Sequence, residues 1–222
     1  MRRALFIALA SLSLTVGAAA QTPGWLADPR NGCKVWTRNV AALDAVSWSG
    51  ACVGGLANGK GELEFLKGGK AIWKGDANFV AGKREGRSKL VSADGWTFDG
   101  EYRDGQLDGQ VIEITSGGDR YQGEYRNGSR EGHGVYQLKD GLKYEGDFKD
   151  GQILRGTVTF PDGATYVGEL RNNRPQGQGA FTGKLAGGKI GTISGTWRDG
   201  CFRDGAGGTA ALLATRKECG FE

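Results

Sequence analysis

The sequence contains a single histidine and only four prolines among its 222 residues, and it has no C-x-x-C pair. Its four cysteines therefore lack the usual partners of a zinc site. The histidine, His133, lies between Gly132 and Gly134 at an expected turn, and no nucleophile or orienting carboxylate accompanies it. The glycine-rich stretches lack the G-x-x-x-x-G-K-S/T spacing of a phosphate loop. We predict a non-catalytic protein with no metal site and no cofactor.

The chain also has little excess of positive over negative charge. The formal net charge is +4, and it falls to +2 without Arg2 and Arg3. A nucleic-acid binder normally carries a concentrated basic field. We therefore expect no nucleic-acid partner.

Only one long apolar run is present, from Ala4 to Val16. It follows two arginines, leads to an A-x-A pattern before Gln21, and is shorter than the roughly 20 residues of a bilayer span. We interpret residues 1–20 as a signal peptide rather than as a membrane anchor. The mature protein should then be exported, to a bacterial periplasm or, as the alternative, as a secreted protein.

Export determines how the cysteines are interpreted, because an oxidising compartment favours disulfides. Four cysteines allow three pairings. Two lie before the glycine-rich middle of the chain and two after it, so the simplest pairing is Cys33 with Cys52 and Cys201 with Cys219. Disulfides would then tie both ends of the fold.

Glycine, in contrast, is abundant, with 41 residues against a usual share of about 7%. The glycines belong to an internal repeat in which a large apolar residue precedes a glycine by two positions. Seven such anchor residues follow one another at intervals of 22 to 27 residues. They are Trp48, Trp73, Phe98, Tyr121, Tyr144, Tyr166 and Ile193.

Each repeat has the pattern of a β-hairpin. The segment YQGEY alternates large and polar residues, as in a strand with one buried face. We expect Gly123, between Tyr121 and Tyr125 on that face, to make room for a side chain of a neighbouring strand. Asp-Gly and Asn-Gly pairs, which accept positive φ at low cost, separate the strands. They occur at Asp94/Gly95, Asp104/Gly105, Asn127/Gly128, Asp140/Gly141, Asp150/Gly151, Asp162/Gly163 and Asp199/Gly200.

The segment YQGEYRNGSREGHGVY, residues 121–136, resembles a MORN (membrane occupation and recognition nexus) repeat. The resemblance extends over residues 48–207 as seven repeats, although Ala77 replaces an aromatic residue in the second. Together with the expected signal peptide, it indicates a MORN repeat protein of a bacterial exported type, and the resemblance does not imply an enzyme. The implied fold is all-β, an elongated single-layer antiparallel sheet of successive β-hairpins. Residues 21–47 and 208–222 remain as N-terminal and C-terminal caps.

A second column of side chains, four residues after each anchor, shares the face of the anchors. It begins with Cys52, so a bridge to Cys33 would pin the N-terminal cap over the first strands. Together the two columns predict an aromatic face that is either a narrow core or a binding groove. The candidate binding residues are Trp73, Phe98, Tyr102, Tyr121, Tyr125, Tyr144, Phe148 and Tyr166.

The opposite face carries a basic row formed by Arg103, Arg126, Lys149, Arg171 and Arg198. Carboxylates such as Glu124 and Asp199 recur in each repeat within side-chain reach of these cations. The favoured interpretation of the row is therefore a solvated ladder of ion pairs. The alternative is a binding module for anionic lipid headgroups of the phosphoinositide type. We predict a scaffold for protein–protein interaction in the cell envelope, whose partner is another envelope protein or a second copy of the chain.

Overall fold

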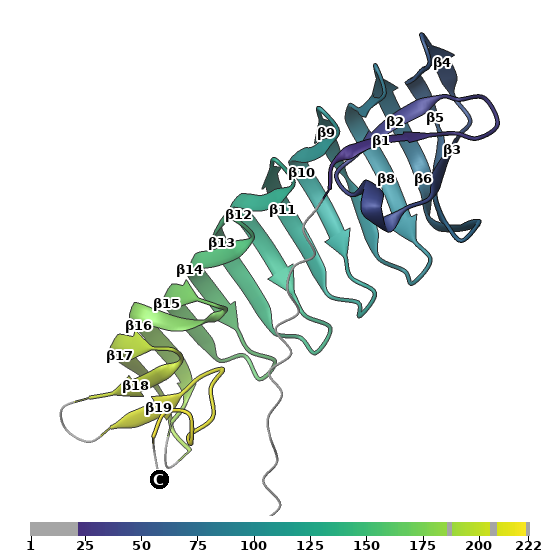
Figure 1. The fold of residues 1–222 in the computed structure, drawn as a ribbon. Helices are drawn as coiled ribbons and strands as arrows, with labels where there is room; N and C mark the ends of the chain where they lie inside the picture. The colour runs from purple at the N-terminus through teal and green to yellow at the C-terminus, as the bar shows by residue number, and fades with distance from the viewer. Residues whose placement is uncertain (1–21, 186–187, 205–207, 221–222) are drawn as a thin grey trace, which may run out of the picture.

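The computed structural model of the chain describes residues 22–185, 188–204 and 208–220. The predicted signal peptide, residues 1–20, lies outside the described residues. The described part forms one extended sheet of hairpins, with one short 3₁₀ helix and no α-helix (Figure 1). None of its helical segments has the length and apolar character needed to cross a bilayer. The predicted all-β fold is confirmed.

The strands follow one another along the chain with short connections. The N-terminal end supplies β1 (Gly24–Ala27), β2 (Lys34–Thr37), the 3₁₀ helix η1 (Val40–Ala42), β3 (Ala45–Trp48) and β4 (Ala51–Val53). The middle supplies β5 (Leu56–Lys67), β6 (Lys70–Val80), β7 (Lys83–Arg84), β8 (Gly86–Ser92), β9 (Thr97–Arg103), β10 (Gln106–Ile114), β11 (Arg120–Arg126), β12 (Ser129–Gln137), β13 (Lys143–Lys149) and β14 (Gln152–Thr159). The C-terminal end supplies β15 (Thr165–Arg171), β16 (Arg174–Lys184), β17 (Ile190–Arg198), β18 (Cys201–Arg203) and β19 (Thr209–Ala211).

The strands from β8 to β19 pair antiparallel in chain order, and β6 joins this series to β5. The hairpins therefore advance along one axis, which gives the predicted elongated single layer (Figure 1). The hairpin of β1 and β2 departs from this plan, because it crosses the face of the first strands (Figure 1). A parallel bridge between Lys34 and Leu56 joins it to β5. Residues 22–44, called the head below, thus add a second layer at one end.

Two kinds of glycine turn join the strands. At Asp104–Gly105 and Asn127–Gly128 both residues have positive φ, between +50° and +83°. This is the geometry of the two-residue type I′ hairpin loop, whose twist matches that of the flanking strands. At the turns that contain Asp94 and Asp140, only the following glycine has positive φ. The first kind, in which two successive residues have positive φ and the second is glycine, is called the tight turns below; it also includes Gly54–Gly55 and Ala81–Gly82.

The tight turns stack along one edge of the sheet. In each, the glycine N–H donates to a carbonyl of the preceding hairpin. The pairs are Gly105 to Arg84 (3.0 Å), Gly128 to Leu107 (2.8 Å) and Gly151 to Arg130 (3.0 Å). Successive repeats are therefore held in register at their turns as well as along their strands.

The strands bend sharply at the glycine inside the repeat. Residues four apart in a straight strand lie about 13 Å from each other. The rings of Tyr121 and Tyr125, however, meet edge to face with their centroids 5.6 Å apart. A bend at Gly123, where the register with β12 shifts, brings the two rings together. The Tyr121 hydroxyl then donates to the carbonyl of Glu124 at 3.1 Å.

The side chain that lies across Gly123 is Tyr121, from the same strand. The expectation that a neighbouring strand would supply it was wrong, because the bend folds the anchor ring back over its own glycine. A methyl group on Gly123, or on its cross-strand partner Gly134, would collide with this tyrosine. The same arrangement recurs around Tyr166. Two facing glycines thus form a slot for one aromatic ring.

Two hydrophobic clusters fill the inside of the bend. The larger one follows the repeats and contains Val111, Tyr121, Tyr125, Leu142, Tyr144, Phe148, Ile153, Val158, Ala164, Tyr166, Leu170, Phe181, Trp197 and Phe202. The smaller one lies at the N-terminal end and contains Cys33, Val35, Val46, Trp48, Ala57, Leu63, Phe65, Ala77, Phe79 and Leu90. Rings of neighbouring repeats touch within the larger cluster, as Tyr121 and Phe148 do at 5.1 Å between centroids. Each repeat is therefore packed against the next.

Both ends of the fold are tied by the predicted disulfides. Cys33 pairs with Cys52, with 5.8 Å between their Cα atoms, and Cys201 pairs with Cys219, with 5.4 Å. No free cysteine remains among the described residues. Closing loops of this size typically adds about 2–4 kcal/mol to the stability of a fold, which matters for a single-layer sheet with a narrow core.

Replacing Gly134 by alanine tests the ring slot. The added methyl group would press on Tyr121, so we expect the free energy of unfolding to fall by about 1–3 kcal/mol, measured by urea denaturation. Gly117→Ala is the matched control, because neither glycine has a positive φ and a Cβ at position 117 would meet only the Thr115 hydroxyl, at 3.6 Å. Equal losses in the two variants would contradict this account of the slot.

Candidate ligand-binding site

Most of the aromatic face that the sequence offered as a binding surface lies in the core. Six of its eight residues are at most 7% exposed: Tyr102, Tyr121, Tyr125, Tyr144, Phe148 and Tyr166. Trp73 and Phe98 are half-buried, and their stacked rings lie 5.9 Å apart. These two rings are the part of the predicted face that a ligand can contact.

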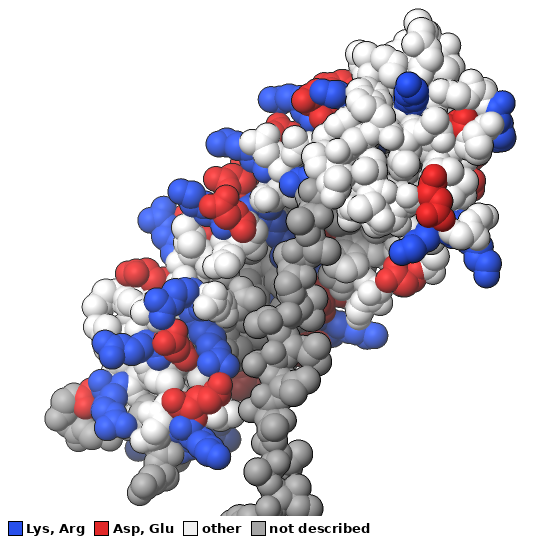
Figure 2. Space-filling view, viewed as in Figure 1, with Lys and Arg blue, Asp and Glu red and all other residues white. Residues whose placement is uncertain are grey.

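The five side chains of the basic row are exposed on the repeats. Arg103 pairs with Asp108 at 3.5 Å, and Arg171 pairs with Asp199 at 2.9 Å. Within the described part of the chain, the other three form no ion pair with a carboxylate. Figure 2 shows acidic and basic side chains interspersed along the repeats. The ladder is thus incomplete, and exposed pairs of this kind add little stability.

His133 lies inside β12 and not at a turn, which corrects the expectation from its two flanking glycines. Its side chain is exposed, and its Nδ1 is 3.9 Å from a carboxylate oxygen of Asp147. Arg155 binds the other oxygen of Asp147 at 2.7 Å. No cluster of three or more metal-ligating side chains occurs in the ranges that the structure describes. The surroundings of His133 are those of a surface ion pair.

On the inner side of the bend, a buried carboxylate, Glu113, pairs with a half-buried arginine, Arg130. Arg130 donates to Glu113 Oε2 through Nε at 3.0 Å and Nη2 at 2.7 Å, and the Tyr125 hydroxyl donates to the same oxygen at 2.5 Å. The guanidinium lies between the rings of Tyr121 and Tyr136, 4.7 and 4.6 Å from their centroids. Burial, and then the charge of Glu113, raise the pKa of the Tyr125 phenol, which stays protonated as a donor. Glu113 thus supplies the counter-ion of Arg130 from within the fold.

A cavity of about 330 Å³, called the head cavity below, lies between the head and the sheet. Strands β5 to β10 form its floor, and residues 37–43 of the head form its roof. Its lining is largely apolar and includes Leu43, Phe65, Trp73, Phe98 and Leu107. Two charged residues, Arg38 and Arg84, also belong to the lining, which includes no Asp or Glu. Small-molecule and side-chain pockets have this size and this mixture of groups.

Arg84, at the end of β7, is only 8% exposed. Its guanidinium carbon lies 4.2 Å from the ring centroid of Tyr102 and 6.0 Å from that of Phe65. Its buried Nε has no hydrogen-bond partner, and no carboxylate of the described residues forms an ion pair with it. A buried nitrogen of a charged group without a hydrogen-bond partner is unfavourable, because stacking on Tyr102 replaces only part of the lost contact with water. It therefore marks a place where a ligand anion would be stabilised.

The head is seated on the row of tight turns. A methyl group on a turn glycine would collide with the head at three successive turns: Gly82 with Trp25, Gly105 with Trp36, and Gly128 with Arg38. Arg38 also donates to the carbonyl of Asn127 at 3.0 Å. The turn glycines thus serve twice, because they allow the positive φ of the turn and leave a flat surface for the head. This seating fixes the roof of the cavity.

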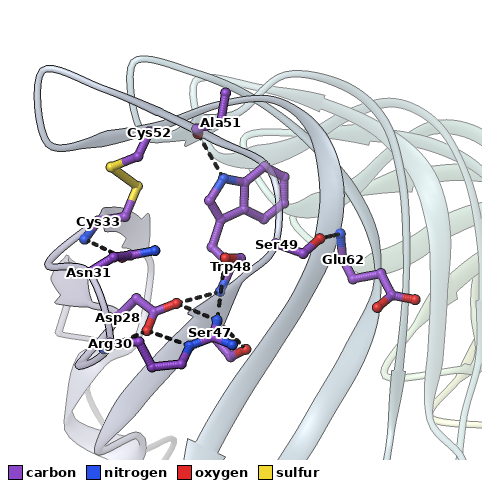
Figure 3. Close-up of polar contacts among 10 residues, drawn as sticks. All are labelled: Asp28, Arg30, Asn31, Cys33, Ser47, Trp48, Ser49, Ala51, Cys52 and Glu62. Carbon is purple, nitrogen blue, oxygen red and sulfur yellow. Dashed lines mark hydrogen bonds and ion pairs between the residues drawn. A yellow bond between two sulfur atoms is a disulfide. The ribbon is translucent and has the colours of Figure 1, made fainter.

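A second anchor holds the start of the head (Figure 3). The Asp28 carboxylate is fully buried and accepts the Trp48 N–H at 2.9 Å and Arg30 Nη2 at 2.6 Å. These bonds, that of the Arg30 side chain above all, hold the pKa of Asp28 well below its usual range in spite of burial. The Cys33–Cys52 bridge lies beside this carboxylate, and the loop it closes contains all of the roof residues.

Sequence reasoning missed Arg38, Arg84 and Leu43 as site residues. A signal was present in the repeat itself, at the position two residues after the glycine of each tight turn. Other repeats place an apolar residue there, and these residues are Ala57, Leu107, Ile153 and Phe202. Arg84 and Arg130 are the charged exceptions, and the structure shows that both are turned toward the inside of the bend.

A family model described as the MORN repeat matches residues 98–110, 121–143, 144–153 and 166–184. These segments lie in β9 to β16 and include four of the seven anchors, so the match supports a MORN repeat protein over this part of the chain. MORN repeats are generally protein-binding or lipid-binding modules and generally non-catalytic. A search of curated proteins finds no match to the chain.

Asp28→Asn tests the anchor of the head. Asparagine keeps one acceptor oxygen and loses the charge, so we expect the free energy of unfolding at pH 7 to fall by about 1–3 kcal/mol. The pKa of Asp28 is lower in the folded chain than its unfolded value near 3.9. Its carboxylate therefore stabilises the fold fully above that pH, and this contribution is lost as the pH falls below it.

The measurement is urea denaturation of wild type and variant between about pH 7 and pH 2. The difference between them should shrink as the pH falls below roughly 4. Asp150→Asn is the control, because Asp150 is exposed in a tight turn whose positive φ asparagine also accepts. A difference that stays constant down to pH 2 would show that the charge of Asp28 contributes nothing to the anchor.

Proposed function

We propose that this chain is a non-catalytic scaffold of the cell envelope, which binds a partner protein at the head cavity. The observation that carries the proposal is the half-buried pair Trp73 and Phe98 in the wall of that cavity. They are the accessible remainder of an otherwise buried aromatic face, and aromatic residues in a concave site are typical anchors of protein recognition.

Two further features support this role. The matched repeat family consists generally of binding modules. The two disulfides fit an oxidising compartment outside the cytosol. We infer the bacterial periplasm as that compartment, with secretion as the alternative.

A protein partner suits the cavity better than a lipid surface does. Membrane binding through anionic headgroups requires a continuous field of exposed cations. The basic row is instead interrupted by acidic residues, and two of its five members are already paired. The head cavity offers apolar walls that would enclose a side chain.

Site-specific photo-crosslinking in intact cells tests this function. A photoactivatable residue at Gln106, which lines the head cavity, should capture one partner reproducibly. The same residue at Gln110, exposed elsewhere on β10, is the matched control and should not capture it. The captured protein, once purified, should bind the purified chain. Capture of the chain alone from Gln106 would instead indicate self-association.

A liposome experiment tests the alternative function directly. Sedimentation with anionic vesicles should recover little of the chain, and changing Arg126, Lys149 and Arg171 together to glutamine should make no difference. Strong, salt-sensitive binding that this triple variant loses would overturn the protein-scaffold proposal in favour of a peripheral lipid-binding module.

A further inference from the structure

Arg84 and Arg130 occupy equivalent positions in two different repeats. Each follows the glycine of a tight turn by two residues, after Gly82 and Gly128 respectively. Each stacks its guanidinium on an aromatic ring inside the bend. The two arginines therefore form a comparison within a single chain.

Their surroundings differ at one decisive position. Opposite the anchor Tyr121, the cross-strand partner on the preceding strand is Glu113, which binds Arg130. Opposite the anchor Trp73, the residue in the same place is Phe65. Arg84 thus faces a ring where Arg130 faces a carboxylate, and nothing in the described chain replaces the missing counter-ion.

Arg84, which lacks an internal carboxylate partner, lies at the head cavity. Arg84 lines the cavity together with Arg38, and no acidic residue belongs to the lining. Guanidinium groups bind carboxylates through paired, charge-assisted hydrogen bonds, which are strongest where water is excluded. A ligand that brings a carboxylate to Arg84 would complete the arrangement that Glu113 completes for Arg130.

The remaining lining of the cavity indicates which chemical group would accompany this carboxylate in the ligand. Trp73, Phe98 and Leu107 form apolar walls around the space. The volume of about 330 Å³ suits one large side chain with the backbone that carries it. The last residue of a protein combines these features, because its terminal carboxylate and its side chain branch from the same carbon atom.

We propose that the head cavity binds the C-terminus of the partner protein, with the terminal carboxylate on Arg84 and an apolar final side chain against Trp73 and Phe98. This inference rests on the proposed scaffold function and specifies the part of the partner that is recognised. It makes Arg84 a binding residue.

The test uses the full exported chain and fluorescent heptapeptides that share one sequence and end in each of the twenty amino acids. Every peptide is made with a free C-terminal carboxylate and as the C-terminal amide, and binding is followed by fluorescence polarisation. For peptides ending in large apolar residues, we expect the free acid to bind about tenfold or more tightly than the amide, the effect of one charge-assisted contact.

Three variants assign this preference to Arg84. Arg84→Gln should reduce the acid-to-amide ratio to about one while the amide still binds, which shows that the cavity remains folded. Phe65→Glu should do the same, because it supplies Arg84 with the internal counter-ion that Arg130 already has. Arg87→Gln is the control, since Arg87 is exposed and paired with Asp99 outside the cavity, and should keep the full ratio.

The outcomes separate this inference from the function on which it rests. Equal affinity for acids and amides, or a preference that survives Arg84→Gln, would overturn the C-terminal carboxylate and leave the scaffold in place. Failure of all twenty acids to bind would also overturn it, even if crosslinking from Gln106 still captured a partner. Binding to phosphoinositide vesicles that Arg84→Gln abolishes would assign the cavity to a phosphate headgroup and overturn both proposals.

Discussion

The close contact between a tyrosine ring and two facing glycines is the constraint on which the rest of this structure depends. Tyr121 can fold back across Gly123 and Gly134 only because neither glycine has a side chain. The resulting bend brings residues four apart along the strand into contact and converts one face of a single-layer sheet into a core. The narrow core of this long sheet, and the inward position of Arg84 and Arg130, both follow from that bend.

The seating of the head extends the same principle from the strands to the turns. The head covers the sheet edge where successive glycines leave the backbone bare, and its large side chains Trp25 and Trp36 rest there. The head therefore covers the first repeats without requiring a complementary pattern of side chains from them. The cavity is the space that remains between this cover and the first strands.

The repeat, the all-β sheet, the disulfides and the tight turns could be predicted from the sequence, because each depends on local spacing. Asp104 and Gly105 adopt the turn that such pairs favour, for example. The head cavity could not be predicted, because the residues that line it come from the head and from the six strands β5 to β10. The sequence left open whether the face of Tyr121 is a core or a groove, since alternation shows which face a residue shares and not that the strand will fold onto that face.

The disulfide between Cys33 and Cys52 has a consequence for when this protein becomes able to bind. The covalent loop contains every residue of the cavity roof, from Thr37 to Leu43. A newly made chain with both thiols reduced would hold that roof by noncovalent contacts alone. The greater conformational entropy of the open loop would then favour detachment of the roof from the sheet. Under the proposed function, maturation of the head cavity would be coupled to thiol oxidation, and the chain would acquire its full affinity only in an oxidising compartment.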